Sequence, residues 1–239
     1  MFAPGQTAKD ISAVIVDDNN VESHETFEVT LSSVTGATLG AVKTMAYVIE
    51  DNDFAQCVGS IATIAGSAGP DILMGTPGDD IIVGLGGGDT IYGLGGNDII
   101  CGRNGPDTIF GGSGDDLIFT GDGDDVVDAG SGNDTVYTRR GNDKATGGTG
   151  ADTIYGGPGG DQISGAEGND TLVGAQGNDD ISGNGGEDRL RGGPGNDKLD
   201  GGPGADRLNG GTGNDACEGG SGTDVASPAA SCETTTGIP

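Results

Sequence analysis

Apolar residues recur at every ninth position over the C-terminal two thirds of the chain, from Leu73 to Ala226. Each apolar residue lies two positions after the aspartate that ends a glycine-rich hexapeptide. A three-residue segment centred on the apolar residue alternates outward, inward and outward, as in a short strand. The pattern predicts short strands separated by tight turns and stacked as a repeat structure. The inward residues are Leu73, Ile91, Ile109, Val127, Ala145, Ile163, Ile181, Leu199 and Cys217 in odd repeats, and Ile82, Ile100, Ile118, Val136, Ile154, Leu172, Leu190, Leu208 and Ala226 in even repeats.

The turns carry a second pattern, in which glycine and aspartate keep a fixed phase over 18 consecutive nonapeptides. Glycine lacks Cβ, so it adopts positive φ and lets backbone carbonyls converge, while aspartate adds a carboxylate. Ca²⁺ takes six to eight oxygen ligands, which two stacked turns can supply and one cannot. The candidate ligands are Asp71, Asp80, Asp89, Asp98, Asp107, Asp116, Asp125, Asp134, Asp143, Asp152, Asp161, Asp170, Asp179, Asp188, Asp197, Asp206, Asp215 and Asp224.

Most repeats read G-G-x-G-x-D-x-U-x with U aliphatic, and residues 66–227 resemble the RTX (repeats in toxin) family of calcium-binding proteins. The resemblance implies an all-β, right-handed parallel β-roll in which two nonapeptides make one coil. It gives about nine coils, with odd repeats in one sheet, even repeats in the other, and multiple Ca²⁺ ions bound by the aspartates. Each sheet would contribute a core one residue wide, so we expect metal binding to supply most of the stability.

Charge agrees with a cation-binding role. The chain has 38 acidic and 10 basic residues, and its formal net charge of −28 makes nucleic acid an improbable partner. Glycine-rich acidic chains are often disordered, and we expect disorder here in the absence of calcium. There is no apolar run long enough to span a membrane, and the first residues do not form a signal peptide.

Four cysteines fall near the two ends of the array and suggest two disulfides, Cys57 with Cys101 and Cys217 with Cys232. An even number of cysteines fits an oxidising, extracellular compartment. Zinc is the alternative, but the chain has no C-x-x-C motif and only His24 as a histidine ligand.

Residues 1–53 differ from the repeats and show three strand-like patterns, at 11–15, 27–31 and 45–49. The segments F-A-P-G-Q-T-A-K, D-D-N-N-V-E-S-H-E-T-F-E-V-T-L and I-E-D-N-D resemble the C-terminal half of a Calx-β domain, an antiparallel sandwich. In that family acidic loop residues bind calcium; a solvated acidic loop is the alternative. The matching residues here are Asp17, Asp18, Glu22, Glu25, Asp51 and Asp53.

Segments that flank the array are expected to cover its ends. Residues 54–65 form a linker and cap, in which Cys57–Ala65 reads as a metal-free nonapeptide with Ala62 at the aspartate position and Ile64 inward. Residues 228–239 leave the repeat frame, and a bridge to Cys217 would fold this tail across the last coil.

Two irregularities stand out within the array. Around Thr138–Thr146 arginines replace turn residues, and the turns beginning at Thr120 and Ala129 have also lost their first glycine. We expect the calcium ladder to be weakest there. The outer face of the even strands is apolar over its first half and suits a protein or cell-surface partner. Its flanking residues are Ile81, Val83, Ile99, Cys101, Leu117, Phe119, Tyr137 and Tyr155, before Arg189, Arg191 and Arg207.

No protease, hydrolase or nucleotide-binding motif occurs outside the repeats, so we do not expect an enzyme. The first hypothesis is a secreted calcium-binding module, a fragment of a larger extracellular adhesion or surface protein. The alternative is a C-terminal folding and secretion module of an enzyme whose catalytic domain lies outside this chain. A third is a small self-contained calcium sink.

Overall fold

The computed structural model describes residues 25–30, 44–49, 56–226, 232 and 234–236, and divides the chain into two units, Met1–Phe54 and Ala55–Pro239. Among these residues all regular structure is β-strand, and there is no helix that could cross a membrane.

The described part of the first unit is one antiparallel pair of strands, β1 (Glu25–Thr30) and β2 (Thr44–Ile49). Phe27 is opposite Tyr47 and Val29 is opposite Met45. These strands match two of the three predicted from the sequence. The third, at 11–15, lies outside the described residues.

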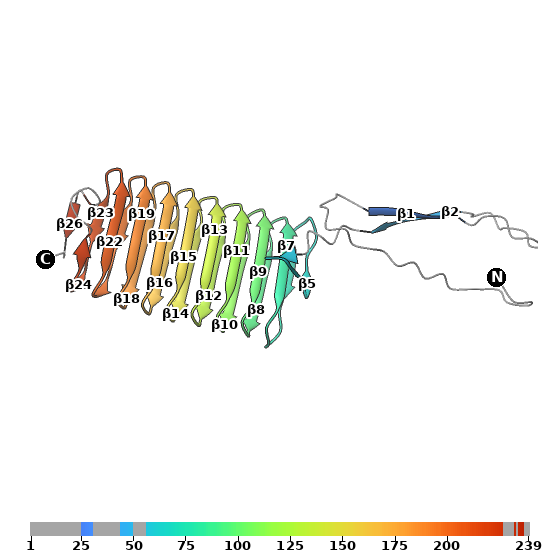
Figure 1. Cartoon of the computed structure of the whole chain (residues 1–239), viewed down its shortest axis with the longest axis horizontal. Helices are drawn as coiled ribbons and strands as arrows, with labels where there is room; N and C mark the ends of the chain where they lie inside the picture. Colours follow the sequence, from blue (N-terminus) through green and yellow to red (C-terminus); the bar gives the residue numbers. More distant parts are fainter. Residues whose placement is uncertain (1–24, 31–43, 50–55, 227–231, 233, 237–239) are drawn as a thin grey trace, which may run out of the picture. The chain divides into compact units, whose positions relative to one another are not determined.

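Two parallel sheets of ten strands each make up most of the second unit (Figure 1). We call the two sheets odd and even after the repeats that supply their strands. The odd sheet ends with a strand of the C-terminal tail, and the even sheet begins with a strand of the N-terminal cap. The odd sheet contains β6 (Ile72–Met74), β8 (Thr90–Gly95), β10 (Thr108–Ser113), β12 (Val126–Ser131), β14 (Lys144–Thr149), β16 (Gln162–Glu167), β18 (Asp180–Gly185), β20 (Lys198–Asp200), β23 (Ala216–Glu218) and β26 (Thr234–Thr236). The even sheet contains β5 (Ile64–Ala65), β7 (Ile81–Gly86), β9 (Ile99–Asn104), β11 (Leu117–Asp122), β13 (Thr135–Arg140), β15 (Thr153–Pro158), β17 (Thr171–Gln176), β19 (Arg189–Pro194), β22 (Arg207–Thr212) and β25 (Val225–Ala226).

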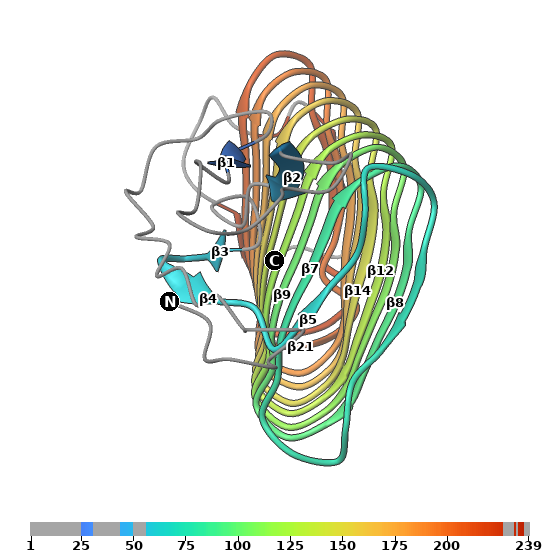
Figure 2. The same cartoon turned by 90° about the vertical axis from the view of Figure 1, so that its right-hand side faces the viewer.

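Neighbouring strands in each sheet pair 18 residues apart, which is two nonapeptides. Ile109 on β10 is opposite Ile91 on β8 and Val127 on β12, and the Thr108 N–H donates to the Asp89 carbonyl at 2.8 Å. Figure 2 shows the successive coils nearly superimposed along the stack. The parallel solenoid of about nine turns, with odd and even repeats in separate sheets, is therefore confirmed.

The inward apolar residues of both sheets form a single core cluster. Ile100, Ile109 and Ile118 are fully buried in it, whereas Ala226 in the last coil is only half-buried. We expected two cores, each one residue wide; the structure corrects this to one shared core. The reason is that the two sheets face each other across each coil, so their apolar side chains pack together.

Most turns after the first two repeats use left-handed backbone at their second and fourth positions. In the turn that begins at Gly165, Ala166 has φ 79° and Gly168 has φ 135°. The second position accepts other residue types at a cost of about 1 kcal/mol or more each. The fourth position does not, because a Cβ on Gly168 would overlap the Gly150 carbonyl oxygen of the preceding coil.

The N-terminal end of the solenoid carries a hairpin of β3 (Gln56–Cys57) and β4 (Ser60–Ile61). Val58 and Gly59 between them have φ 54° and 80°, as in the two-residue turns that suit a twisted hairpin. The predicted disulfide between Cys57 and Cys101 is present and fastens the hairpin to β9. Ile64 is half-buried against the core, as predicted for the cap.

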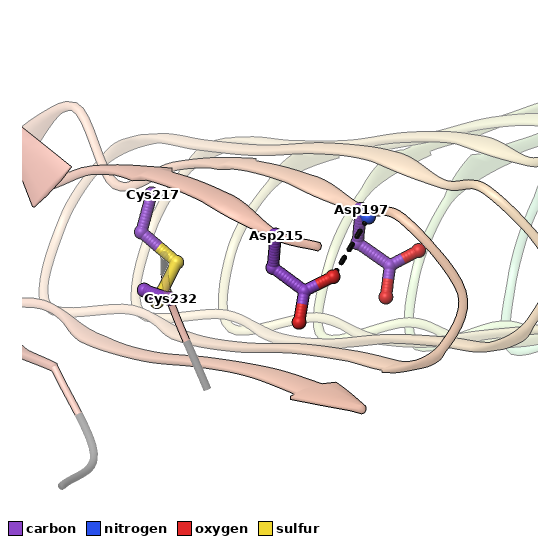
Figure 3. The surroundings of a disulfide bond; sticks show 4 residues. All are labelled: Asp197, Asp215, Cys217 and Cys232. Carbon is purple, nitrogen blue, oxygen red and sulfur yellow. Dashed lines mark hydrogen bonds between the residues drawn. A yellow bond between two sulfur atoms is a disulfide. The ribbon is translucent and has the colours of Figure 1, made fainter. Parts of the chain in front are cut away.

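The C-terminal end is closed by the second predicted disulfide, Cys217–Cys232, which Figure 3 shows. Two short strands, β21 (Pro203–Gly204) and β24 (Ser221–Gly222), pair nearby. Thr234–Thr236 pairs with Ala216–Glu218 at the same 18-residue offset as the repeats. The tail therefore extends the odd sheet, whereas the sequence indicated that it leaves the frame. The disulfide explains this, because it holds the tail beside an open strand edge that lacks backbone partners.

The hairpin covers the beginning of the apolar outer face of the even sheet. Val83 is fully buried beneath it, with Ile81, Ile99 and Phe119 packed around the disulfide. Further along, Phe119, Tyr137 and Tyr155 stack with ring centroids 4.9–5.0 Å apart, and Tyr155 is exposed. A protein or cell-surface partner for this face stays a prediction.

Replacing Gly168 by alanine should destabilise the solenoid by about 2 kcal/mol or more, because the new Cβ combines left-handed strain with overlap on the preceding coil. Gly78→Ala is the control, since Gly78 holds the same turn position in an early coil without left-handed backbone, and the atom nearest to the new Cβ would lie 4.0 Å away. Urea unfolding in calcium compares the two free energies. Equal losses would contradict the steric argument.

Candidate metal centre

The phased aspartates form hydrogen-bonded ladders that run the length of the solenoid. One carboxylate oxygen, Oδ1, accepts the backbone N–H of the aspartate 18 residues earlier, so each aspartate ties its own coil to the previous one. Figure 3 shows the step from the Asp197 N–H to Asp215 Oδ1, at 2.9 Å. Equivalent steps run from Asp71 N–H with Asp89 to Asp206 N–H with Asp224, all at 2.8–3.0 Å.

The other carboxylate oxygen, Oδ2, is buried and accepts no hydrogen bond in most of these residues. Such an atom is costly in a folded protein unless a cation or donor faces it. The residues with an orphaned Oδ2 are Asp89, Asp98, Asp107, Asp116, Asp125, Asp134, Asp143, Asp152, Asp161, Asp170, Asp179, Asp188, Asp197, Asp206 and Asp224.

In most repeats that begin with glycine, the orphaned oxygen faces a backbone carbonyl of the next coil across a space left open by that glycine. At Gly84 an added Cβ would lie 2.7 Å from the Gly102 carbonyl oxygen and even closer to Asp89 Oδ2. Gly183 repeats the arrangement with Asp188 Oδ2 and the Gly201 carbonyl. We call this space the glycine cradle.

The atoms that border the cradle are a carboxylate oxygen and a main-chain carbonyl oxygen. Oxygen ligands of this kind suit a hard cation such as Ca²⁺. Among the described residues no three His, Cys, Asp or Glu side chains converge on one point. Backbone carbonyls must therefore supply most of the ligands, and a thiol- or imidazole-binding metal has no counterpart in the described part of the chain.

The first two repeats differ from the rest. Asp71 Oδ2 accepts the N–H of Ser67 at 2.6 Å and its hydroxyl at 2.8 Å, and Asp80 Oδ2 accepts the Thr76 N–H at 2.6 Å. The hydrogen bond from Thr76 lowers the pKa of Asp80. These two carboxylates are satisfied by their own turns, so the orphaned array begins at Asp89.

Burial raises the pKa of the phased carboxyls from Asp89 to Asp206, even though each accepts a backbone hydrogen bond that acts in the opposite direction. The pKa rises to about 7 at Asp107 and Asp161, where neighbouring carboxylates add to the effect of burial. It rises to about 6 at Asp116, Asp134, Asp143, Asp152, Asp170, Asp179, Asp188 and Asp206.

A second set of hydrogen bonds, which we did not predict, is made by Asn or Asp at the residue before the phased aspartate in many repeats. Here the side chain of one coil accepts the backbone N–H of the next, in the direction opposite to the first ladder. Asp79 Oδ1 accepts the Asn97 N–H at 2.7 Å, and Asn97 Oδ1 accepts the Asp115 N–H at 2.8 Å. The recurrence of Asn and Asp at 18-residue intervals is the signal that identifies it in the sequence.

The remaining predicted site residues belong to the N-terminal part of the chain. Asp17, Asp18, Glu22, Asp51 and Asp53 lie outside the described residues. Glu25 begins β1 in the first unit.

Without calcium, the solenoid should be more ordered in mild acid than at neutral pH. A carboxyl with a raised folded-state pKa stabilises the fold below its unfolded value of 3.8, and this stabilisation is lost as the pH rises through 6 to 7. We expect more β signal in circular dichroism at about pH 5 than at about pH 7.5 in chelator, and the reverse dependence for calcium affinity. A chelated chain equally ordered at both pH values would contradict this.

Comparison with known proteins agrees with this geometry. A search of curated proteins found no match. The family model of the RTX calcium-binding nonapeptide repeat matches residues 65–100, 74–109, 102–136, 137–172, 164–199 and 191–226, which together span about two thirds of the chain. These matches cover every glycine cradle and every phased aspartate described above. The chain belongs to the RTX calcium-binding nonapeptide repeat family.

Proposed function

We propose that this chain is a secreted module, without catalytic activity of its own, whose β-roll folds as it binds calcium along both rows of turns. It serves as part of a larger extracellular adhesion or surface protein. The observation that carries the proposal is the row of buried Oδ2 atoms, most of which lie in glycine-led repeats and face a carbonyl of the next coil across the glycine cradle.

Electrostatics makes calcium a folding partner rather than an accessory. Carboxylates on neighbouring coils are spaced at about 4.8 Å, where two like charges repel by about 3 kcal/mol at an effective dielectric near 20. The formal net charge is −28, so the chain has too few basic side chains to neutralise this repulsion. Divalent ions between coils would convert the repulsion into attraction.

Two disulfides support an extracellular location, because such bonds persist in oxidising compartments. Calcium there is abundant enough to fill numerous weak sites. The Calx-β-like pattern of residues 1–53 supports membership of a larger surface protein. In the parent sequence, further Calx-β-like copies would support this role, and a hydrolase motif would instead indicate the export module of an enzyme.

The proposal is tested by titrating the full, chelated chain with calcium while following circular dichroism. We expect a cooperative gain of β signal in the micromolar to millimolar range typical of such sites, and a much weaker response to magnesium. A β-rich spectrum in excess chelator at neutral pH, unchanged by calcium, would refute the proposal.

Asp161→Asn should weaken calcium binding at its own cradle by about tenfold or more, because one carboxylate charge is lost. It should also stabilise the calcium-free fold, since the amide can accept from the Asp143 N–H and donate to the Gly174 carbonyl. Asp180→Asn is the control, because Asp180 lies on the outer surface and pairs with Lys198 at 3.2 Å. Calorimetric titration and urea unfolding measure both effects; identical behaviour of the two variants would count against the site.

A further inference from the structure

Three consecutive repeats lack the glycine that opens the cradle. They begin with Thr120, Ala129 and Thr138, and the side chains of all three are fully or almost fully buried. Strand register places Thr120 level with Gly102 of the preceding coil, and Ala129 level with Gly111. Their β-carbons therefore point into the space that glycine leaves open in the neighbouring coils.

The two threonine hydroxyls also bind the carbonyls that border this space. Thr120 Oγ1 donates to the Thr138 carbonyl at 2.6 Å, and Thr138 Oγ1 donates to the Gly156 carbonyl at 2.7 Å. In a glycine repeat the equivalent carbonyl faces Oδ2 across the open cradle, as the Thr120 carbonyl faces Asp107 at Gly102. The hydroxyl thus takes both the space and a ligand that an ion would need.

The same coils have other contacts that require no metal. The Phe119, Tyr137 and Tyr155 rings stack across them, and the Arg139 guanidinium lies 5.6 Å from the centroid of the Phe119 ring. Arg140 pairs with Asp122 at 3.8 Å. The aspartate ladder also continues unbroken, with the Asp125 N–H donating to Asp143 Oδ1 at 2.8 Å.

We propose that residues 120–146 form a metal-free joint, in which the side chains of Thr120, Ala129 and Thr138 occupy the cradles and divide the array into two calcium-binding blocks. This inference rests on the proposed function, since it concerns which of the cradles hold ions. It also gives the physical reason for the weak calcium ladder expected near Thr138–Thr146: the chain there substitutes its own hydroxyls, rings and arginines for ions.

The first test restores the glycines in the full chain. The triple variant T120G/A129G/T138G should bind about three more calcium ions than the wild type at saturation, one for each opened cradle. Equilibrium dialysis with elemental analysis gives the number of ions per chain, and circular dichroism verifies that the variant is folded. A folded triple variant that binds the same number of calcium ions as the wild type would contradict the proposal that this segment is metal-free.

A second test uses conservative variants that preserve the ladder, in case the glycine variant fails to fold. Asp143→Asn, inside the joint, should leave the number of bound ions unchanged, whereas Asp161→Asn, one coil further on, should lower it by about one. Loss of an ion from Asp143→Asn would overturn the proposal. A wild-type chain that binds no calcium would overturn both this inference and the proposed function. If only the metal-free segment is wrong, the wild-type chain still binds calcium.

Discussion

Repulsion between stacked carboxylates is the constraint on which the rest of this structure depends. Every coil adds two aspartates to rows in which the carboxyls from Asp80 onward are buried, and each lies beside its counterparts in the neighbouring coils. The fold tolerates this because Oδ1 accepts a backbone N–H of the preceding coil, while Oδ2 remains available to a cation. Metal binding, protonation and folding are therefore coupled through the same atoms.

Glycine has two separate duties in this arrangement. At the fourth turn position it avoids overlap with the coil before it, as at Gly168, and this duty exists whether or not metal is bound. At the first position it keeps the cradle open, as at Gly84, and this duty concerns the ion. Thr120, Ala129 and Thr138 stand where other repeats have this glycine. Their side chains are therefore compatible with the fold, but they fill the cradle.

Each end of the solenoid is fastened by a disulfide. The terminal coils have one neighbour instead of two, so they have fewer partners for their strand edges and cores. Cys57–Cys101 fastens a hairpin over the outer face near the first coils, and Cys217–Cys232 places a further strand beside the last. In the first two repeats the turns of Asp71 and Asp80 satisfy their own carboxylates.

Sequence alone determined the elements that repeat. The nine-residue period fixed the inward position of residues such as Ile109, the pairing of alternate repeats and the phase of the aspartates, because one local pattern recurs in every coil. The cysteine positions likewise predicted both disulfides. The tertiary structure decided what depends on contacts between coils: the union of both rows into one core, the carbonyl that each Oδ2 faces, and the course of the tail. It also showed that the Thr120 hydroxyl reaches the Thr138 carbonyl, which no spacing predicts, because that contact depends on how closely one coil stacks on the next.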